Sequence, residues 1–174
     1  MYKNYKKLAK FTQKIKTTYL KGVKPEAFIE NLKKLEINVV VDIRAWSIYP
    51  LYYYPKNMKK LLEENGIEYI RYKALGNPSE LRKRAGENFE LGKQLYLEYL
   101  IKDLRAKESL IELYKNLRFR KNYCLICYCP TFDPKLCHRF WLKEMLINLK
   151  REQLGFEGDY KLEYVSKRKI RQEE

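Results

Sequence analysis

Short apolar and β-branched runs alternate with helical segments along this chain, and that alternation limits the fold more than any other feature. The predicted strands are 15–20, 37–44, 67–72, 122–129 and 160–165. The helical segments between them are 24–36, 57–65, 88–118 and 137–152. Such alternation is typical of a mainly parallel sheet with helices on both faces. We therefore predict an α/β fold, a Rossmann-like three-layer α/β/α domain with a five-stranded sheet in the order 3-2-1-4-5.

The length of the chain favours a single domain, because 174 residues suit one core and are few for two. We expect a basic N-terminal arm over residues 1–13, the α/β domain over 14–165 and a charged tail over 166–174. No apolar run reaches the roughly 18 residues that a membrane helix needs. The N-terminus also lacks the apolar region of a secretory signal. The expectation is a cytoplasmic protein without a membrane partner.

The charge of the chain is strongly positive, with 37 Lys and Arg against 22 Asp and Glu and a formal net charge of +15. A field of this size attracts polyanions. Nucleic acid is therefore one candidate partner, and a well-solvated surface is the plainer explanation. The tyrosines Tyr49, Tyr52, Tyr53 and Tyr54 favour nucleic acid, because aromatic rings stack on bases while lysines follow phosphates. The same rings also suit packing over an edge of the sheet.

The four cysteines all lie in one short segment, at Cys124, Cys127, Cys129 and Cys137. A disulfide framework spreads its bridges over a chain, so this clustering indicates thiol chemistry or a metal instead. Alternation along a strand puts Cys127 and Cys129 on one face and Cys124 on the other. We interpret Cys124 as a small buried apolar residue. A zinc site built from Cys127, Cys129, Cys137 and His138 stays open as an alternative.

Cys137 stands at the predicted start of a helix, followed by His138 and Arg139. The unpaired N–H groups of a helix start bind anions and favour a thiolate. Cys137, Cys127 and His138 are therefore candidate catalytic residues, and Arg139 is a candidate ligand-binding residue. Asp42 and Arg44, which end the second strand, are a candidate proton handler and a candidate anion ligand. The structural alternative is a capping His138 and an ion pair between Asp42 and an arginine.

Several short motifs follow one another along the chain: Asp42-Ile43-Arg44, Tyr49-Pro50, Leu75-Gly76, Cys127 and Cys137-His138-Arg139. In these motifs the chain resembles the domain-of-unknown-function 488 family. Two positions differ from the family pattern: Thr18-Tyr19-Leu20 replaces a glycine-led turn, and Cys129 replaces an acidic residue. The resemblance implies a Rossmann-like domain and a shared site at the DIR and CHR motifs. It implies no reaction.

Three functions compete on the sequence alone. The first is an enzyme, or a degenerate enzyme, that uses cysteine chemistry on a small anionic or nucleotide-like ligand, which Arg44, Arg139 and Gly76 hold at the C-terminal edge of the sheet. The second is a nucleic-acid-binding module, and the third is a zinc-stabilised structural domain. Apart from that zinc alternative, the sequence assigns neither a cofactor nor a metal, and it predicts no oligomeric state.

Overall fold

A parallel four-stranded sheet forms the centre of the computed structural model, which describes residues 2–46, 50–117, 120–129, 133 and 135–156. The strands are β1 (Ile15–Tyr19), β2 (Val39–Asp42), β3 (Glu68–Arg71) and β4 (Tyr123–Cys127). All three strand pairs are parallel, and the order is β1-β4-β2-β3. The predicted α/β class with a parallel sheet is therefore confirmed. The predicted fifth strand, 160–165, lies outside the described residues.

The predicted order 3-2-1-4-5 is wrong in one respect, because β4 lies between β1 and β2. All five residues of β4 are buried, as expected of a central strand covered on both faces. In β1 only Ile15 and Thr18 are buried, which suits a strand at the edge. The sequence did not decide whether β4 lies outside β1 or between β1 and β2, because the long connection before β4 allows either position.

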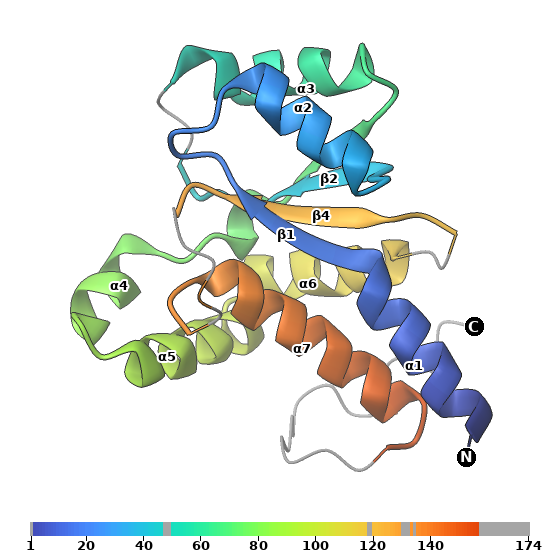
Figure 1. Cartoon of the computed structure of the whole chain (residues 1–174). Helices are drawn as coiled ribbons and strands as arrows, with labels where there is room; N and C mark the ends of the chain where they lie inside the picture. The colour runs from blue at the N-terminus through green and yellow to red at the C-terminus, as the bar shows by residue number, and fades with distance from the viewer. Residues whose placement is uncertain (1, 47–49, 118–119, 130–132, 134, 157–174) are drawn as a thin grey trace.

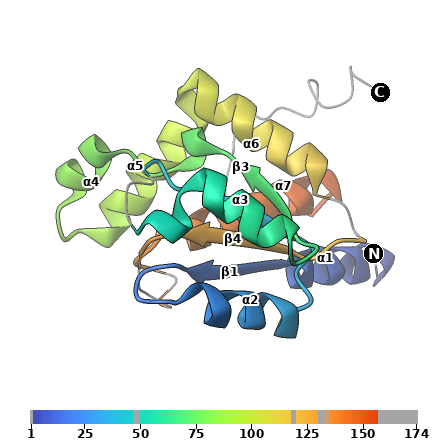
Figure 2. The same cartoon turned by 90° about the horizontal axis from the view of Figure 1, so that it is seen from above.

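Helices cover both faces of the sheet (Figures 1 and 2). On one face lie α2 (Pro25–Lys34) and α3 (Pro55–Glu63). On the other lie α1 (Tyr2–Lys14), α5 (Phe89–Lys102), α6 (Leu104–Asn116) and α7 (His138–Gln153). The short helix α4 (Ser79–Ala85) and the 3-10 turns η1 (Leu51–Tyr53) and η2 (Lys73–Leu75) occur in connections. Within the described residues, no helix combines the length and apolarity needed to cross a membrane.

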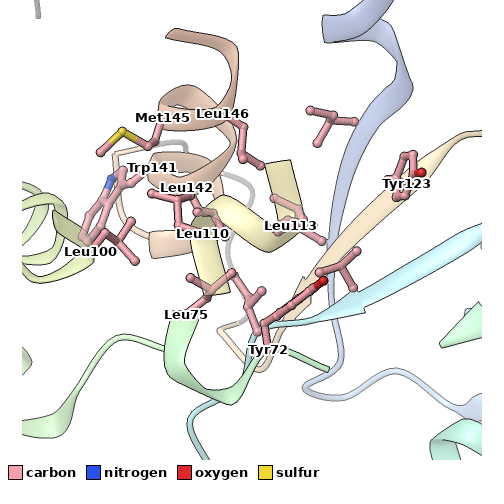
Figure 3. Close-up of a cluster of buried hydrophobic side chains, with 14 of the residues drawn as sticks. Tyr72, Leu75, Leu100, Leu110, Leu113, Tyr123, Trp141, Leu142, Met145 and Leu146 are labelled. Carbon is pink, nitrogen blue, oxygen red and sulfur yellow. The ribbon is translucent and has the colours of Figure 1, made fainter. Parts of the chain in front are cut away.

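Alternation along β2 and β4 divides the buried side chains into two cores. Val41, Leu125 and Cys127 belong to the core beneath α5, α6 and α7, and Cys124 and Ile126 belong to the core beneath α2 and α3. Figure 3 shows the larger core, where leucines of α6 and α7 gather near Tyr72 and Leu75. The expected role of Cys124 as a buried apolar residue is confirmed, since its side chain is fully buried.

The N-terminal segment is a helix that packs on the domain. Phe11 of α1 is only 4% exposed and belongs to the larger core. Asn4 Nδ2 donates a hydrogen bond to the Leu154 carbonyl, 3.0 Å away, beyond the end of α7. Helices α5 and α6 are separate, because the Asp103 side chain accepts a hydrogen bond from the Ala106 N–H and caps α6.

Strands β1 and β4 are neighbours whose chains leave the sheet in opposite directions. After β1 the chain turns to α2 on one face, and after β4 it turns to α7 on the other (Figure 1). In open parallel sheets, such a divergence leaves room for a ligand site beyond the strand ends. The predicted adjacency of these two strands is confirmed, and the cysteine segment lies beside this point.

Candidate metal centre

Two elements bring the cysteines together. Cys127 is the last residue of β4, Cys137 is the N-cap of α7, and His138 is the first residue of that helix. The side chains of Cys127 and Cys137 are each 1% exposed, and their sulfur atoms lie 3.2 Å apart. The end of a central strand thus meets the start of a buried helix at two thiols.

Four ligand atoms converge at this point. Cys127, Cys129, Cys137 and His138 each offer one donor atom, and these atoms all lie within 4.8 Å of one another. Zinc–sulfur bonds of about 2.3 Å place two sulfurs of a tetrahedral site about 3.8 Å apart. The Cys127 and Cys137 sulfurs would therefore have to separate by only about half an ångström to hold a zinc ion.

The imidazole of His138 is buried beside the thiols. Its Nδ1 lies 3.7 Å from Cys137 Sγ, and its Nε2 is a buried atom with no hydrogen-bond partner among the described residues. A buried polar atom without a partner costs free energy. A neutral imidazole is also a common zinc ligand.

Arg139 surrounds the sulfur atoms with hydrogen-bond donors. Its Nη1 donates to Cys127 Sγ at 3.1 Å, to Cys137 Sγ at 3.2 Å and to the Cys129 carbonyl at 3.0 Å. The Cys129 N–H also donates to Cys127 Sγ at 3.3 Å. Arg139 is fully buried, and a buried cation requires compensating negative charge. These donors favour thiolate, the form of cysteine that binds metals.

The pKa values of the three thiols shift in different directions. Hydrogen bonds with Cys127 and Cys137 hold the pKa of Cys129 well below its usual range. The bond with Cys129 is the main reason that the pKa of Cys127 rises to about 11, and bonds with Cys127 and Cys129 raise the pKa of Cys137. A metal ion bound here would displace the protons of its thiol ligands.

Asp42 and Arg44 do not join this cluster. Arg44 donates from Nε to Asp42 Oδ1 at 2.8 Å and from Nη2 to Asp42 Oδ2 at 2.6 Å. Tyr69 donates to the same carboxylate, and Arg44 also donates to the Tyr53 carbonyl. Tyr53 and Tyr69 pack in the core beneath α2 and α3, whereas Cys127 faces the other core. The two motifs therefore occupy opposite faces, and the structural alternative of an Asp–Arg pair is the one observed.

Gly76 lines a separate cleft of about 440 Å³, next to η2 and the segment that follows β2. A Cβ at Gly76 would lie 2.4 Å from the Ala45 backbone nitrogen, so only glycine permits this close approach. The cleft is lined by Ala45, Trp46, Lys73, Ala74, Gly76, Pro78, Ser79, Glu80, Tyr99, Asp103 and Arg105. Trp46 is 63% exposed, and Lys73 Nζ lies 5.4 Å from the centroid of its ring.

Sequence reasoning missed Tyr96, which lies between His138 of the cysteine cluster and the backbone next to Gly76 in the cleft. The Tyr96 ring lies 5.5 Å from the His138 ring, and its hydroxyl donates to the Leu75 carbonyl at 2.7 Å. Burial raises the pKa of Tyr96, so it remains a neutral donor. Tyr96 belongs to no sequence motif, so nothing in the sequence indicated this role. Trp46 follows the DIR motif closely but belongs to no motif of its own, and Arg105 is distant from every motif in sequence, so neither was singled out.

Comparison with known proteins supplies a family. No curated protein and no solved structure matches the chain. The model of the domain of unknown function DUF488 matches residues 24–146, a range that runs from the start of α2 into α7. It includes the DIR, LG and CHR motifs and all four cysteines. The chain therefore belongs to the DUF488 family.

Proposed function

We propose that this protein binds one zinc ion through Cys127, Cys129, Cys137 and His138. The observation that carries the proposal is the convergence of three sulfurs and one imidazole within 4.8 Å. Soft thiolates with imidazole in a tetrahedral arrangement are the donor set that zinc prefers. The donors on Arg139 and Cys129 supply the hydrogen bonds to sulfur that tune such centres.

The proposed metal has a structural role. Four protein ligands fill a tetrahedral zinc ion, whereas catalytic zinc sites keep one position open. The deep burial of Cys127, Cys137 and Arg139 supports a closed site. The ion would join the end of β4 to the start of α7, and it would stabilise the folded state because the unfolded chain has no preformed site.

Metal analysis tests this proposal directly. Protein purified without chelator should contain about one zinc per chain, measured by inductively coupled plasma mass spectrometry. Cys127→Ser and Cys137→Ser should lose the metal, while Cys124→Ser, on the opposite face of the same strand, should retain it. Cobalt in place of zinc should show the intense visible bands of tetrahedral thiolate coordination. Absence of zinc together with absence of those bands would overturn the proposal.

Alkylation distinguishes a zinc site from a free nucleophilic cysteine. Iodoacetamide should leave Cys127, Cys129 and Cys137 unmodified in the zinc-loaded protein and should reach Cys129, which is partly exposed, after chelation. A nucleophile would react before chelation. Chelation should also lower the melting temperature of the wild type and leave that of Cys137→Ser unchanged.

A second candidate function concerns the cleft beside Gly76. We propose that it binds a small ligand with an aromatic ring and an anionic group, such as a nucleotide. Trp46 offers an exposed ring for stacking, and Lys73 and Arg105 offer cations in the same cleft. The Asp103 carboxylate accepts a hydrogen bond from the Ala106 N–H at the start of α6. Glu80 adds a further negative charge to the lining of the cleft. The cleft lies beyond the ends of β2 and β3, where parallel sheets commonly bind ligands.

Tryptophan fluorescence tests this second candidate. Titration with AMP and ATP should quench Trp46, while Trp46→Phe should lose the response because Trp141, the other tryptophan, is buried. Lys73→Gln should weaken the response to AMP more than the response to uncharged adenosine. An unchanged spectrum at millimolar nucleotide would contradict the candidate.

A further inference from the structure

Helix α1 carries five lysines and no acidic residue. Its sequence is YKNYKKLAKFTQK, and it precedes the residues matched to the family, 24–146. Lys3, Lys7, Lys10 and Lys14 follow one another at spacings of four, three and four, which places them along a single stripe of the helix. Lys3, Lys7 and Lys10 are exposed, and Lys14 is half-buried.

A lysine of a neighbouring helix extends this stripe. Lys150 of α7 lies over the Phe11 ring, with Nζ 5.6 Å from the ring centroid. Burial and, after it, the charge of Lys7 lower the pKa of Lys150. We define the basic face as the lysines of α1 together with Lys150.

Repulsion among the lysines of the basic face destabilises α1. Like charges three or four residues apart destabilise a helix by about 0.2–0.5 kcal/mol per pair. In the described part of the chain, Lys3, Lys7, Lys10 and Lys14 form no ion pair. The lysines of α3 differ, since Lys59 and Lys60 pair with Glu63 and Glu64. A counterion outside the chain would relieve the repulsion on α1.

We propose that the basic face binds the phosphate backbone of a nucleic acid without reading its base sequence. From Lys3 to Lys14 the helix extends about 16 Å, and a duplex presents about ten phosphate charges over that length. The stripe contains lysine alone, a cation suited to phosphates, and lacks the arginine, asparagine and glutamine side chains that read base edges. This inference does not rest on the proposed metal.

Fluorescence anisotropy with a labelled duplex of about 20 base pairs tests the inference, at salt concentrations from about 50 to 200 mM. The wild type should bind, and its affinity should fall steeply with salt. The variant K3Q/K7Q/K10Q/K14Q should bind at least about tenfold more weakly, and its salt slope should be shallower by about three to four, since each phosphate contact contributes about 0.9. It should fold normally, because the substitutions remove repulsion within α1.

The matched control is K34Q/K56Q/K59Q/K60Q, which removes the same charge from α2 and α3 on the opposite face. Its affinity for the duplex should stay within about threefold of the wild type, since distant charges are screened at these salt concentrations. An equal loss in both variants would overturn the inference in favour of net charge alone. Absence of binding at about 50 mM salt, or stripe-dependent binding to phosphatidylserine vesicles without binding to the duplex, would also overturn it.

Discussion

Arg139 is a buried cation whose hydrogen bonds end on sulfur. Its guanidinium also lies over the Phe140 ring, 4.6 Å from the centroid, so its position is set by packing as well as by charge. Arginine presents a rigid planar group, whereas lysine presents a single point donor. A lysine at this position would not reproduce the shared contacts with Cys127 and Cys137.

Arg139→Lys should therefore weaken zinc binding while the fold persists. Loss of an outer hydrogen-bond partner typically lowers metal affinity about 10–100-fold. Competition with a chromophoric chelator measures this affinity, and circular dichroism checks the fold. Lys143→Gln, on the same helix but away from the sulfurs, serves as the control. Equal zinc affinity in wild type and Arg139→Lys would argue against a role for the guanidinium at the metal.

Asp42 and Arg44 form the other buried charged group. Asp42→Asn should destabilise the protein by about 3–5 kcal/mol, because it leaves Arg44 buried without its partner. Urea denaturation measures the change. Glu63→Gln, which breaks the exposed pair with Lys59, should cost at most about 1 kcal/mol. Zinc content should not change in Asp42→Asn, since the carboxylate lies on the opposite face of the sheet; loss of zinc would contradict that separation.

Among the connecting elements, the turn at Gly76 and the turn at Ala45 approach each other so closely that a side chain at Gly76 would clash. The backbone at Gly76 follows η2 and presses against Ala45, which follows β2. Gly92 in α5 offers a contrast, because a Cβ there would meet its nearest atoms, on Ala85 and Trp141, at 3.4 and 3.6 Å. The first contact is with backbone, which cannot move aside, and the second is ordinary van der Waals distance.

Gly76→Ala and Gly92→Ala should consequently have opposite effects. Gly76→Ala should destabilise the fold by about 1–3 kcal/mol through overpacking and should disturb the cleft. Gly92→Ala should be neutral or stabilising by up to about 1 kcal/mol, because alanine favours a helix interior. Thermal and urea unfolding measure both. A neutral Gly76→Ala would show that the two turns separate easily.

Across the whole protein, many tyrosines are buried or half-buried. Burial raises the pKa of Tyr114 to about 12, and it also raises those of Tyr53, Tyr69, Tyr72, Tyr96 and Tyr99. An unfolded tyrosine ionises near pH 10. Above that pH the unfolded chain releases protons that the folded chain retains, so stability must fall as pH rises.

Urea unfolding between pH about 9 and 12 should reveal this decline. Tyr114→Phe should make it shallower, because one group no longer releases its proton on unfolding. The variant should also lose a roughly constant increment at all pH values, since Tyr114 donates a 2.8 Å hydrogen bond to Gln153. Parallel declines for the wild type and the variant would contradict the raised pKa.

Much of the architecture follows from local signals. The predicted segments 24–36 and 137–152 correspond to α2 and α7, and the run 122–129 contains β4, whose residues are buried on both faces. Strand alternation correctly separated Cys124 from Cys127. The gathering of Asp42 and Arg44 with the cysteines was expected from a shared sheet edge, but that edge has two faces. Tyr96, distant from every motif, could not be found from spacing.

Most helices and strands, the opposite facing of Cys124 and Cys127 and, as one alternative, the four residues able to hold a metal could be predicted from the sequence, because they depend on periodicity of two or 3.6 and on residues close together in the chain. The position of β4 between β1 and β2, and the placement of the DIR pair and the cysteine cluster on different cores, are seen only in the folded molecule. Strand order and the meeting of distant motifs depend on long connections and on packing between segments far apart in the chain. Local preferences do not encode those choices.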